Sequence, residues 1–272
     1  MPRVVEAVEK MPIETIMDWN GCPIQAVRSR GGTWAFPDYG DALVRTGIAA
    51  WPPHEVIQKL HRSDKFIYFQ PADQPILQSK LGHYVDLQSA NSEDAAVWSY
   101  FGPLARSSRE ARTEWAAAFL GLFCTADKVK DCEISLWRRV PHPDSLSSGG
   151  PELDVCVTTD SELIVIEAKW RATEGHWQGA EGISTQMQLR SRFLVSLGKN
   201  FYPGMRLRLV YVMLDAGQSL PTREDGIDVA CILWSRILRE TPHPLQGELL
   251  RYFRWKWALV PRRPGQPTPE LF

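Results

Sequence analysis

The chain has 272 residues, of which 44% are hydrophobic and 23% charged, and its formal net charge is −1 at pH 7. This length allows one large domain or one domain with a substantial extension, and the composition is ordinary for a globular protein. The near-zero net charge gives no indication of nucleic-acid binding. No apolar run approaches the ~18 residues that cross a bilayer, so we expect no membrane partner.

Five scattered cysteines, odd in number and without Cys-x-x-Cys spacing, argue against a disulfide framework or a zinc site. The six histidines are also dispersed, so a histidine-based metal site has no support. The N-terminus lacks the apolar segment of a secretion signal. We therefore expect a cytoplasmic protein with small buried thiols.

Residues 1–90 carry no motif, and we interpret them as an N-terminal α+β accessory region of unknown role. The pattern predicts helices at Val4–Asp18, Pro53–His61 and Gln74–Leu81, and a short strand at Phe66–Phe69. The region is too hydrophobic to be disordered.

A helix is predicted to begin after Ser92, a good N-cap residue. Acidic residues in a first turn favour the helix dipole, and that is the simplest reason for Glu93 and its neighbour. However, Glu93, Val97 and either Tyr100 or Phe101 share one helical face. If Val97 and Phe101 pack inward, Glu93 lies at the core-facing edge of the first turn. A second helix is predicted from Ser108 to about Phe123, followed by a first strand at Ile134–Val140.

Residues 150–170 have the pattern of a β-hairpin. Two apolar runs, Leu153–Val157 and Leu163–Ile166, flank a polar cluster. A symmetric turn about Asp160 and Ser161 pairs residues whose numbers sum to 321. Asp154 then lies opposite Glu167, with Cβ atoms ~4.5–5.5 Å apart.

Two carboxylates at that separation repel each other unless a cation lies between them or one is protonated. Lys169 shares the face of Glu167, because alternate strand residues point the same way, and relieves part of the repulsion. A hard divalent cation such as Mg²⁺ relieves more. The alternative is that Glu167 and Lys169 are an ordinary solvated pair at the end of an unremarkable hairpin, in a different enzyme or an interaction protein.

At Asp154 and Glu167-Ala168-Lys169 the sequence resembles the PD-(D/E)XK nuclease superfamily, which has the restriction-endonuclease-like fold. The literal Pro-Asp pair is absent, since the chain reads Pro151-Glu152-Leu153-Asp154. The resemblance implies that Asp154 and Glu167 hold Mg²⁺, with Mn²⁺ as a substitute. It also implies the Ala168 carbonyl as a further ligand, and Lys169 as the group that orients or activates the attacking water.

The resemblance extends to two helices. Members of the superfamily often carry a metal-assisting glutamate on the helix before the sheet, which is Glu93 here. A glutamine often follows near the catalytic lysine, and the predicted helix from Gln186 to about Gly198 offers Gln186 and Gln188. These two lie about 200° apart around a helix, so at most one faces the site.

Two basic segments without acids are candidates for contacts with a nucleic-acid backbone. One runs from Ile183 to Leu214 and includes Arg190 and Arg192. The other, Arg251–Arg263, is interleaved with aromatic residues. The alternative is a set of solvated arginines and a helix packed on the core by its tryptophans.

Strands are predicted at Leu207–Leu214 and Val229–Leu233, and a short helix from Trp234. The order resembles the αβββαβ core of the restriction-endonuclease-like fold, with a mixed central sheet flanked by helices. We place this nuclease core at 91–240. Residues 241–272 are expected to form a helix at Leu245–Trp255 and a disordered proline-rich tail.

The expected function is Mg²⁺-dependent hydrolysis of phosphodiester bonds by an endonuclease or exonuclease, with DNA as the partner. The alternative is a non-catalytic nucleic-acid-binding or scaffold module on the same fold. Many such enzymes are homodimers because two sites then address two strands, and the sequence leaves this form open.

Overall fold

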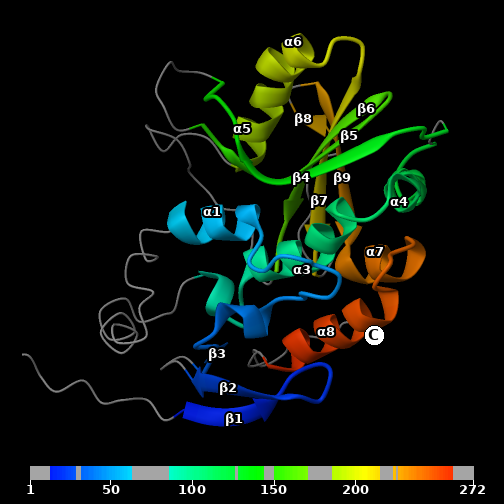
Figure 1. Ribbon diagram of the computed structural model, residues 1–272. Helices are drawn as coiled ribbons and strands as arrows, with labels where there is room; N and C mark the ends of the chain where they lie inside the picture. Colours follow the sequence, from blue (N-terminus) through cyan, green and yellow to red (C-terminus); the bar gives the residue numbers. More distant parts are fainter. Residues whose placement is uncertain are drawn as a thin grey trace, which may run out of the picture.

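The computed structural model describes two sheets and the helices that cover them (Figure 1). The described residues are 13–28, 32–62, 86–125, 128–143, 150–170, 186–214, 223–224 and 226–259. Predicted elements at Phe66–Phe69 and Gln74–Leu81, and the proline-rich tail, lie outside these residues.

The larger sheet has six strands in the order β4-β5-β6-β7-β9-β8. Neighbours are antiparallel from β4 to β6, parallel from β6 through β7 to β9, and antiparallel between β9 and β8. The strands are β4 (Cys132–Arg139), β5 (Glu152–Thr159), β6 (Glu162–Ala168), β7 (Arg206–Met213), β8 (Arg223–Glu224) and β9 (Ile227–Leu233). The chain is therefore a mixed α/β protein, as its sequence predicts.

Helices flank both faces of this sheet because successive strand residues point to opposite sides. On one face, Val165 and Leu209 pack against Phe193 of α5 (Gln186–Phe193). On the other, Ile166 and Val210 belong to a larger core. The helices of that core are α1 (His54–Arg62), α3 (Glu93–Ala105), α4 (Arg109–Gly121), α7 (Trp234–Glu240) and α8 (Gln246–Ala258).

The starts of α3 and α4 agree with the sequence prediction. The Ser92 hydroxyl accepts a hydrogen bond from the Ala95 amide at 2.9 Å, and Ser108 does the same for Ala111 at 3.2 Å. Each cap satisfies an amide that has no partner inside the helix. The capped start of α3 fixes where its first residue, Glu93, lies.

The helix predicted after the β5–β6 hairpin is present, but it is not regular over its whole length. The helix that begins at Gln186 is α-helical to Phe193 and continues as a π-helical turn over Leu194–Gly198 and a short α6 (Lys199–Phe201). A π-turn adds a residue to the helical repeat. The single regular helix expected to Gly198 is therefore interrupted.

The N-terminal region contains a small antiparallel sheet of β1 (Ile13–Met17), β2 (Pro23–Arg28) and β3 (Trp34–Ala35). The helix predicted over Val4–Asp18 is wrong for its described part, because Ile13–Met17 is a strand paired with β2. The reason is the turn after it: Gly21 adopts a φ of +79°, and the Asp18 carboxylate accepts the amides of Asn20 and Cys22. That turn directs the chain into a hairpin.

The helix predicted near Pro53 is confirmed as α1, which packs on the same core as the large sheet. Its Val56 and Leu60 side chains are buried together with Leu43, Val44 and α3. Short 3-10 turns at Tyr39–Ala42 and Asp86–Gln88 complete the described connections. The N-terminal region therefore shares a core with the sheet that carries the candidate site.

Helix α8 packs its aromatic residues inward. Trp255 lies against Trp19 and Phe36, with ring centroids 5.0 and 5.4 Å away, and its indole N–H donates to the Met17 carbonyl. Trp257 packs against Trp170. The tryptophans of α8 therefore pack on the protein core, which is the alternative to a nucleic-acid contact for this segment.

Among the described residues, no helix combines the length and the apolar character that crossing a membrane requires.

Candidate metal site

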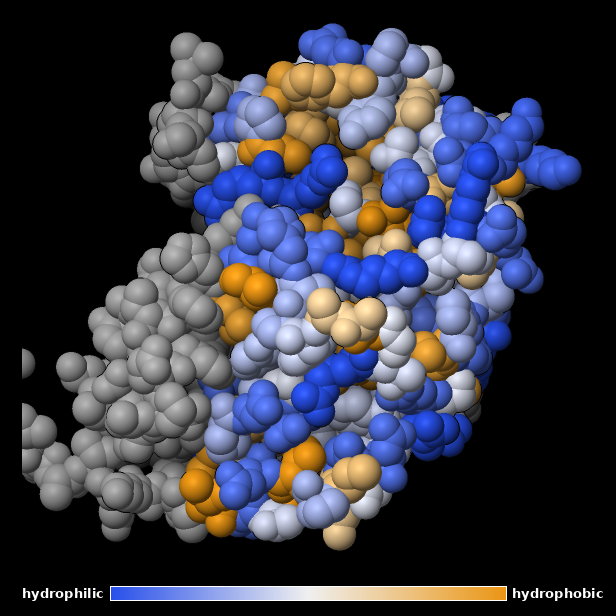
Figure 2. Space-filling view, viewed as in Figure 1, coloured by the Kyte–Doolittle hydropathy of each residue, from blue (hydrophilic) through white to orange (hydrophobic). Residues whose placement is uncertain are grey.

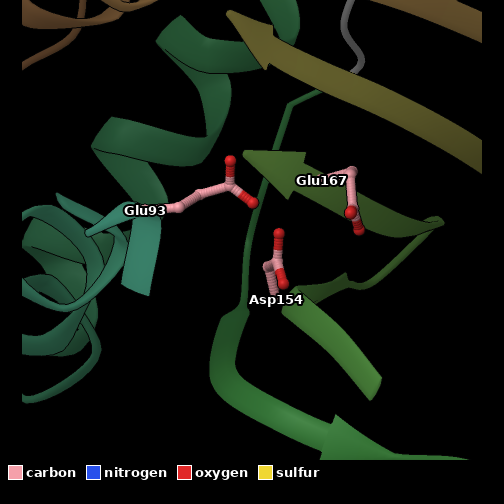
Figure 3. A group of neighbouring side chains, drawn as sticks. All are labelled: Glu93, Asp154 and Glu167. Atoms are coloured by element: carbon pink, nitrogen blue, oxygen red, sulfur yellow. The ribbon is translucent and has the colours of Figure 1, made fainter. Parts of the chain in front are cut away.

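Three carboxylates from separate elements converge on one space: Glu93 from the first turn of α3, Asp154 from β5, and Glu167 from the end of β6 (Figure 3). One oxygen atom of each lies within 4.8 Å of the others. Glu167 is almost fully buried, whereas the other two are partly buried. We call these three residues the acidic triad.

The hairpin register that brings two of these acids together is the one predicted from the turn. Val155 pairs with Ile166 and Thr158 with Leu163, so the numbers of paired residues sum to 321. The same register places Asp154 beside Glu167. The Asp154 Oδ2 atom accepts the Ala168 amide at 3.0 Å, which orients this carboxylate toward the end of β6.

Glu93 reaches the triad because α3 is buried continuously from Ala95 to Leu104, Val97 and Phe101 included, which holds its first turn close to the sheet. Its Oε2 atom accepts the backbone N–H of Trp170 at 3.1 Å. The acidic first turn that favours the helix dipole therefore also contacts the segment that follows β6.

The Lys169 ammonium lies between two members of the triad. It is 2.8 Å from Glu167 Oε1 and 3.1 Å from Glu93 Oε1, and its side chain is only 4% exposed. Burial opposes the charged amine, but the carboxylates of Glu167, Glu93 and Asp154 outweigh it and raise the pKa of Lys169. Lys169 is therefore a charged hydrogen-bond donor in this state.

Arg190 was predicted to contact a nucleic-acid backbone, but its guanidinium is buried within the protein. Its Nε atom lies 2.5 Å from Glu167 Oε2, and Nη2 donates to the Glu152 carbonyl at 3.0 Å. Glu167 thus has Lys169 at one oxygen and Arg190 at the other. The correction follows from α5 packing on the sheet, which turns this arginine toward β5 and β6.

The triad is an electrostatically strained group. Burial raises the pKa of the Asp154 carboxyl well above its usual range, and the charges of Glu167 and Glu93 raise it further. Burial likewise raises the pKa of Glu93, against the opposing effect of Lys169. A bound cation would relieve this strain because it favours the ionised form of each carboxylate.

The donor set fits a hard divalent ion. Mg²⁺ takes oxygen ligands at about 2.1 Å, so two of its ligands lie at most ~4.2 Å apart. The triad oxygens lie within 4.8 Å of one another. A small side-chain movement would bring them within the separation that Mg²⁺ requires, or one water could bridge a carboxylate to the ion. Asp154, Glu167 and Glu93 are therefore the residues that could hold Mg²⁺ or Mn²⁺.

The roles of the remaining predicted residues stay predictions. The backbone N–H of Ala168 is bonded to Asp154, and its carbonyl remains a candidate ligand. Gln188 and Arg192 are partly buried on α5. Gln186 is the first residue of that helix, and its side chain lies outside the described part.

Sequence reasoning missed an unusual backbone at Trp137, on the strand beside Asp154. Trp137 has a φ of +53°, a conformation in which bulky residues are rare. In the β4–β5 register Leu136 lies opposite Val155 and Arg138 lies opposite Leu153, and Trp137 stands between these two pairs, level with Asp154. No local sequence signal marks this feature.

Sequence reasoning also missed Lys59, which reaches the site from α1. Its ammonium is 2.5 Å from Glu152 and 3.0 Å from Asp94, the latter being the neighbour of Glu93. Only the packing of α1 on the sheet brings these residues together.

No protein-family model, curated protein or solved structure matches this chain. The class of protein that the site defines is therefore inferred from its geometry and chemistry.

Proposed function

We propose that the protein is a metal-dependent nuclease of the PD-(D/E)XK type that hydrolyses phosphodiester bonds in DNA. The observation that carries this proposal is the acidic triad with the Lys169 ammonium hydrogen-bonded to two of its members.

The order of elements is consistent with the restriction-endonuclease-like fold. Helices α3 and α4 precede three antiparallel strands, β4 to β6, and α5 then leads into the parallel strand β7. In this arrangement the acidic triad stands at the C-terminal end of β6, which is paired along its length with the parallel strand β7. That end of the strand is where we place the scissile phosphate.

A bound Mg²⁺ would acidify a coordinated water and neutralise charge on the phosphate. Asp154, Glu167 and Glu93 would hold and orient such an ion. Lys169, kept charged by its carboxylate neighbours, orients the attacking water and stabilises the negative charge that develops on phosphate oxygens. Its charged state favours this role over that of a general base.

The first prediction concerns metal binding. Mn²⁺ at about 100 times its dissociation constant should stabilise the wild type by ~2.7 kcal/mol, which raises the melting temperature by roughly 5–10 °C for a chain of this size. Asp154→Asn should lose most of this shift because it removes one anionic ligand. Ca²⁺ and Mg²⁺ titrations followed by melting temperature complete the measurement.

An exposed acid away from the triad provides the control: Glu133→Gln, on β4, should keep the wild-type response. If the wild type shows no shift with any of the three ions, or if Asp154→Asn responds like the wild type, the metal site and the nuclease proposal are both rejected.

The second prediction concerns substrate contact. Arg138 and Arg139 are exposed at the end of edge strand β4 and pair with Leu153 and Glu152, the residues just before Asp154. Strongly hydrophilic residues gather over this part of the surface, between α1 and α5 (Figure 2). No ion pair of either guanidinium is found within the described ranges. We expect both to contact phosphates that flank the scissile one.

Each phosphate contact contributes about 0.9 to the slope of log K against log salt concentration on duplex DNA. Replacing both arginines by glutamine should therefore reduce the slope by ~2, measured in Ca²⁺ so that binding is separated from cleavage. The matched control is Arg251→Gln with Arg254→Gln, two exposed arginines of α8. A loss of slope in the α8 variant alone would place the DNA over α8 and overturn this prediction.

A further inference from the structure

The N-terminal region contributes a cation to the edge of the acidic triad. The Lys59 side chain is 17% exposed, and its ammonium lies between the carboxylates of Asp94 and Glu152, each of which is equally shielded. It also lies over the Trp137 ring, 5.2 Å from the ring centroid. Lys59 belongs to α1, and this helix is held in place because its Val56 and Leu60 side chains are buried in the main core.

The two partners of Lys59 are attached to two ligands of the triad. Asp94 is the residue after Glu93 at the start of α3, and Glu152 is two residues before Asp154 at the start of β5. Lys59 therefore joins, by one ammonium group, the two backbone segments that carry Glu93 and Asp154. The distance between these segments sets the distance between the two carboxylates that would share an ion.

The charges of the region explain why such a cation is needed. The cluster contains five carboxylates: Glu93, Asp94, Glu152, Asp154 and Glu167. Among the described residues, the cations that contact these carboxylates include Lys59, Lys169 and Arg190. Burial opposes the charge of Lys59, yet Asp94 and Glu152 raise its pKa, so this cation persists at neutral pH.

We propose that Lys59 is a positioning residue of the metal site, which fixes the separation of Glu93 and Asp154 by bridging Asp94 and Glu152. This inference rests on the proposed function. It assigns the N-terminal region a direct part in the site, through α1. Groups that hold metal ligands in place typically contribute 10–100-fold in metal affinity, and the lower end of that range is the expectation here because Lys59 acts through neighbours of the ligands.

The test is a calorimetric titration of Mn²⁺ into wild type, Lys59→Met and Lys59→Arg, well below the melting temperature. Lys59→Met should raise the Mn²⁺ dissociation constant about tenfold, and Lys59→Arg should restore most of the affinity because it keeps the bridge and the charge. The direction of the change is decisive. Loss of a positive charge acting only through space would tighten Mn²⁺ binding, whereas loss of positioning weakens it.

The matched control removes a second ion pair that links α1 to the end of α3. Arg106 pairs with Glu55, so Glu55→Gln loosens the docking of α1 without touching Lys59. It should lower the melting temperature and leave the Mn²⁺ affinity unchanged. Unchanged or tighter binding in Lys59→Met would overturn the inference, and so would equal weakening in Glu55→Gln. Absence of Mn²⁺ binding by the wild type would instead reject the proposed function.

Discussion

Lys169→Met should reduce the rate of DNA cleavage by about 10²–10³-fold, the usual loss when one preorganised charge-stabilising donor is removed. Methionine keeps the length of the side chain but cannot donate to water, phosphate or the two carboxylates that Lys169 contacts. Single-turnover cleavage of a labelled duplex at saturating Mg²⁺ measures the effect on chemistry apart from binding.

The Lys169→Met variant should bind the metal ion more tightly than the wild type, although it cleaves DNA more slowly. The ammonium of Lys169 competes with an added ion for Glu93 and Glu167, so its removal should lower the Mn²⁺ midpoint in a thermal titration. A protein that cleaves poorly while binding the ion more tightly has lost a catalytic group and kept its fold. Equal cleavage by both proteins would contradict the enzyme proposal and favour the non-catalytic nucleic-acid-binding alternative.

Lys256→Met should remove a large pH dependence of stability. This lysine of α8 is fully buried, donates to the Ala90 carbonyl at 2.8 Å, and lies 5.5 Å from the centroid of the Trp170 ring. Burial lowers the pKa of Lys256 to about 7, whereas an unfolded lysine titrates near pH ~10.4. Between these values the unfolded chain binds more protons than the folded one, so stability rises with pH.

The expected rise between pH 7 and 10 is on the order of 4 kcal/mol, since each pH unit in this window corresponds to about 1.4 kcal/mol. Urea unfolding in EDTA at several pH values measures it. Lys256→Met should flatten the profile, with more stability than the wild type below pH 7 and less near pH 10, where the lost hydrogen bond to Ala90 dominates. Lys199→Met, at an exposed position, controls for net charge. A wild-type profile equal to that of Lys256→Met would contradict the prediction.

The parts of the site that lie close together in the sequence could be predicted from it. Asp154, Glu167 and Lys169 belong to one hairpin, so alternation and turn symmetry fix their relation. Glu93 could be placed because its helix has a clear cap residue, Ser92, directly before it. In each case a local sequence pattern determines where the side chain lies.

The parts that depend on packing between distant segments could not be predicted. Arg190 has the composition signal of a nucleic-acid contact, yet α5 packs so that it reaches Glu167. Lys59 and Glu152 are 93 residues apart, and no periodicity connects them. The helix predicted over Val4–Asp18 fails at Ile13–Met17, because the turn at Gly21 pairs this segment with β2 in a hairpin.

The left-handed backbone of Trp137 has a consequence for attempts to make the protein more robust. Holding a bulky residue in that region costs roughly 1–3 kcal/mol, and the surrounding packing on Trp98, with ring centroids 6.1 Å apart, keeps it there. Glycine accepts this geometry at no steric penalty, but the Trp137 side chain is only 3% exposed, and removing a buried tryptophan side chain typically costs about 3–5 kcal/mol. Trp137→Gly should therefore lower the stability of the fold, because the packing of the buried indole outweighs the cost of the backbone strain beside Asp154.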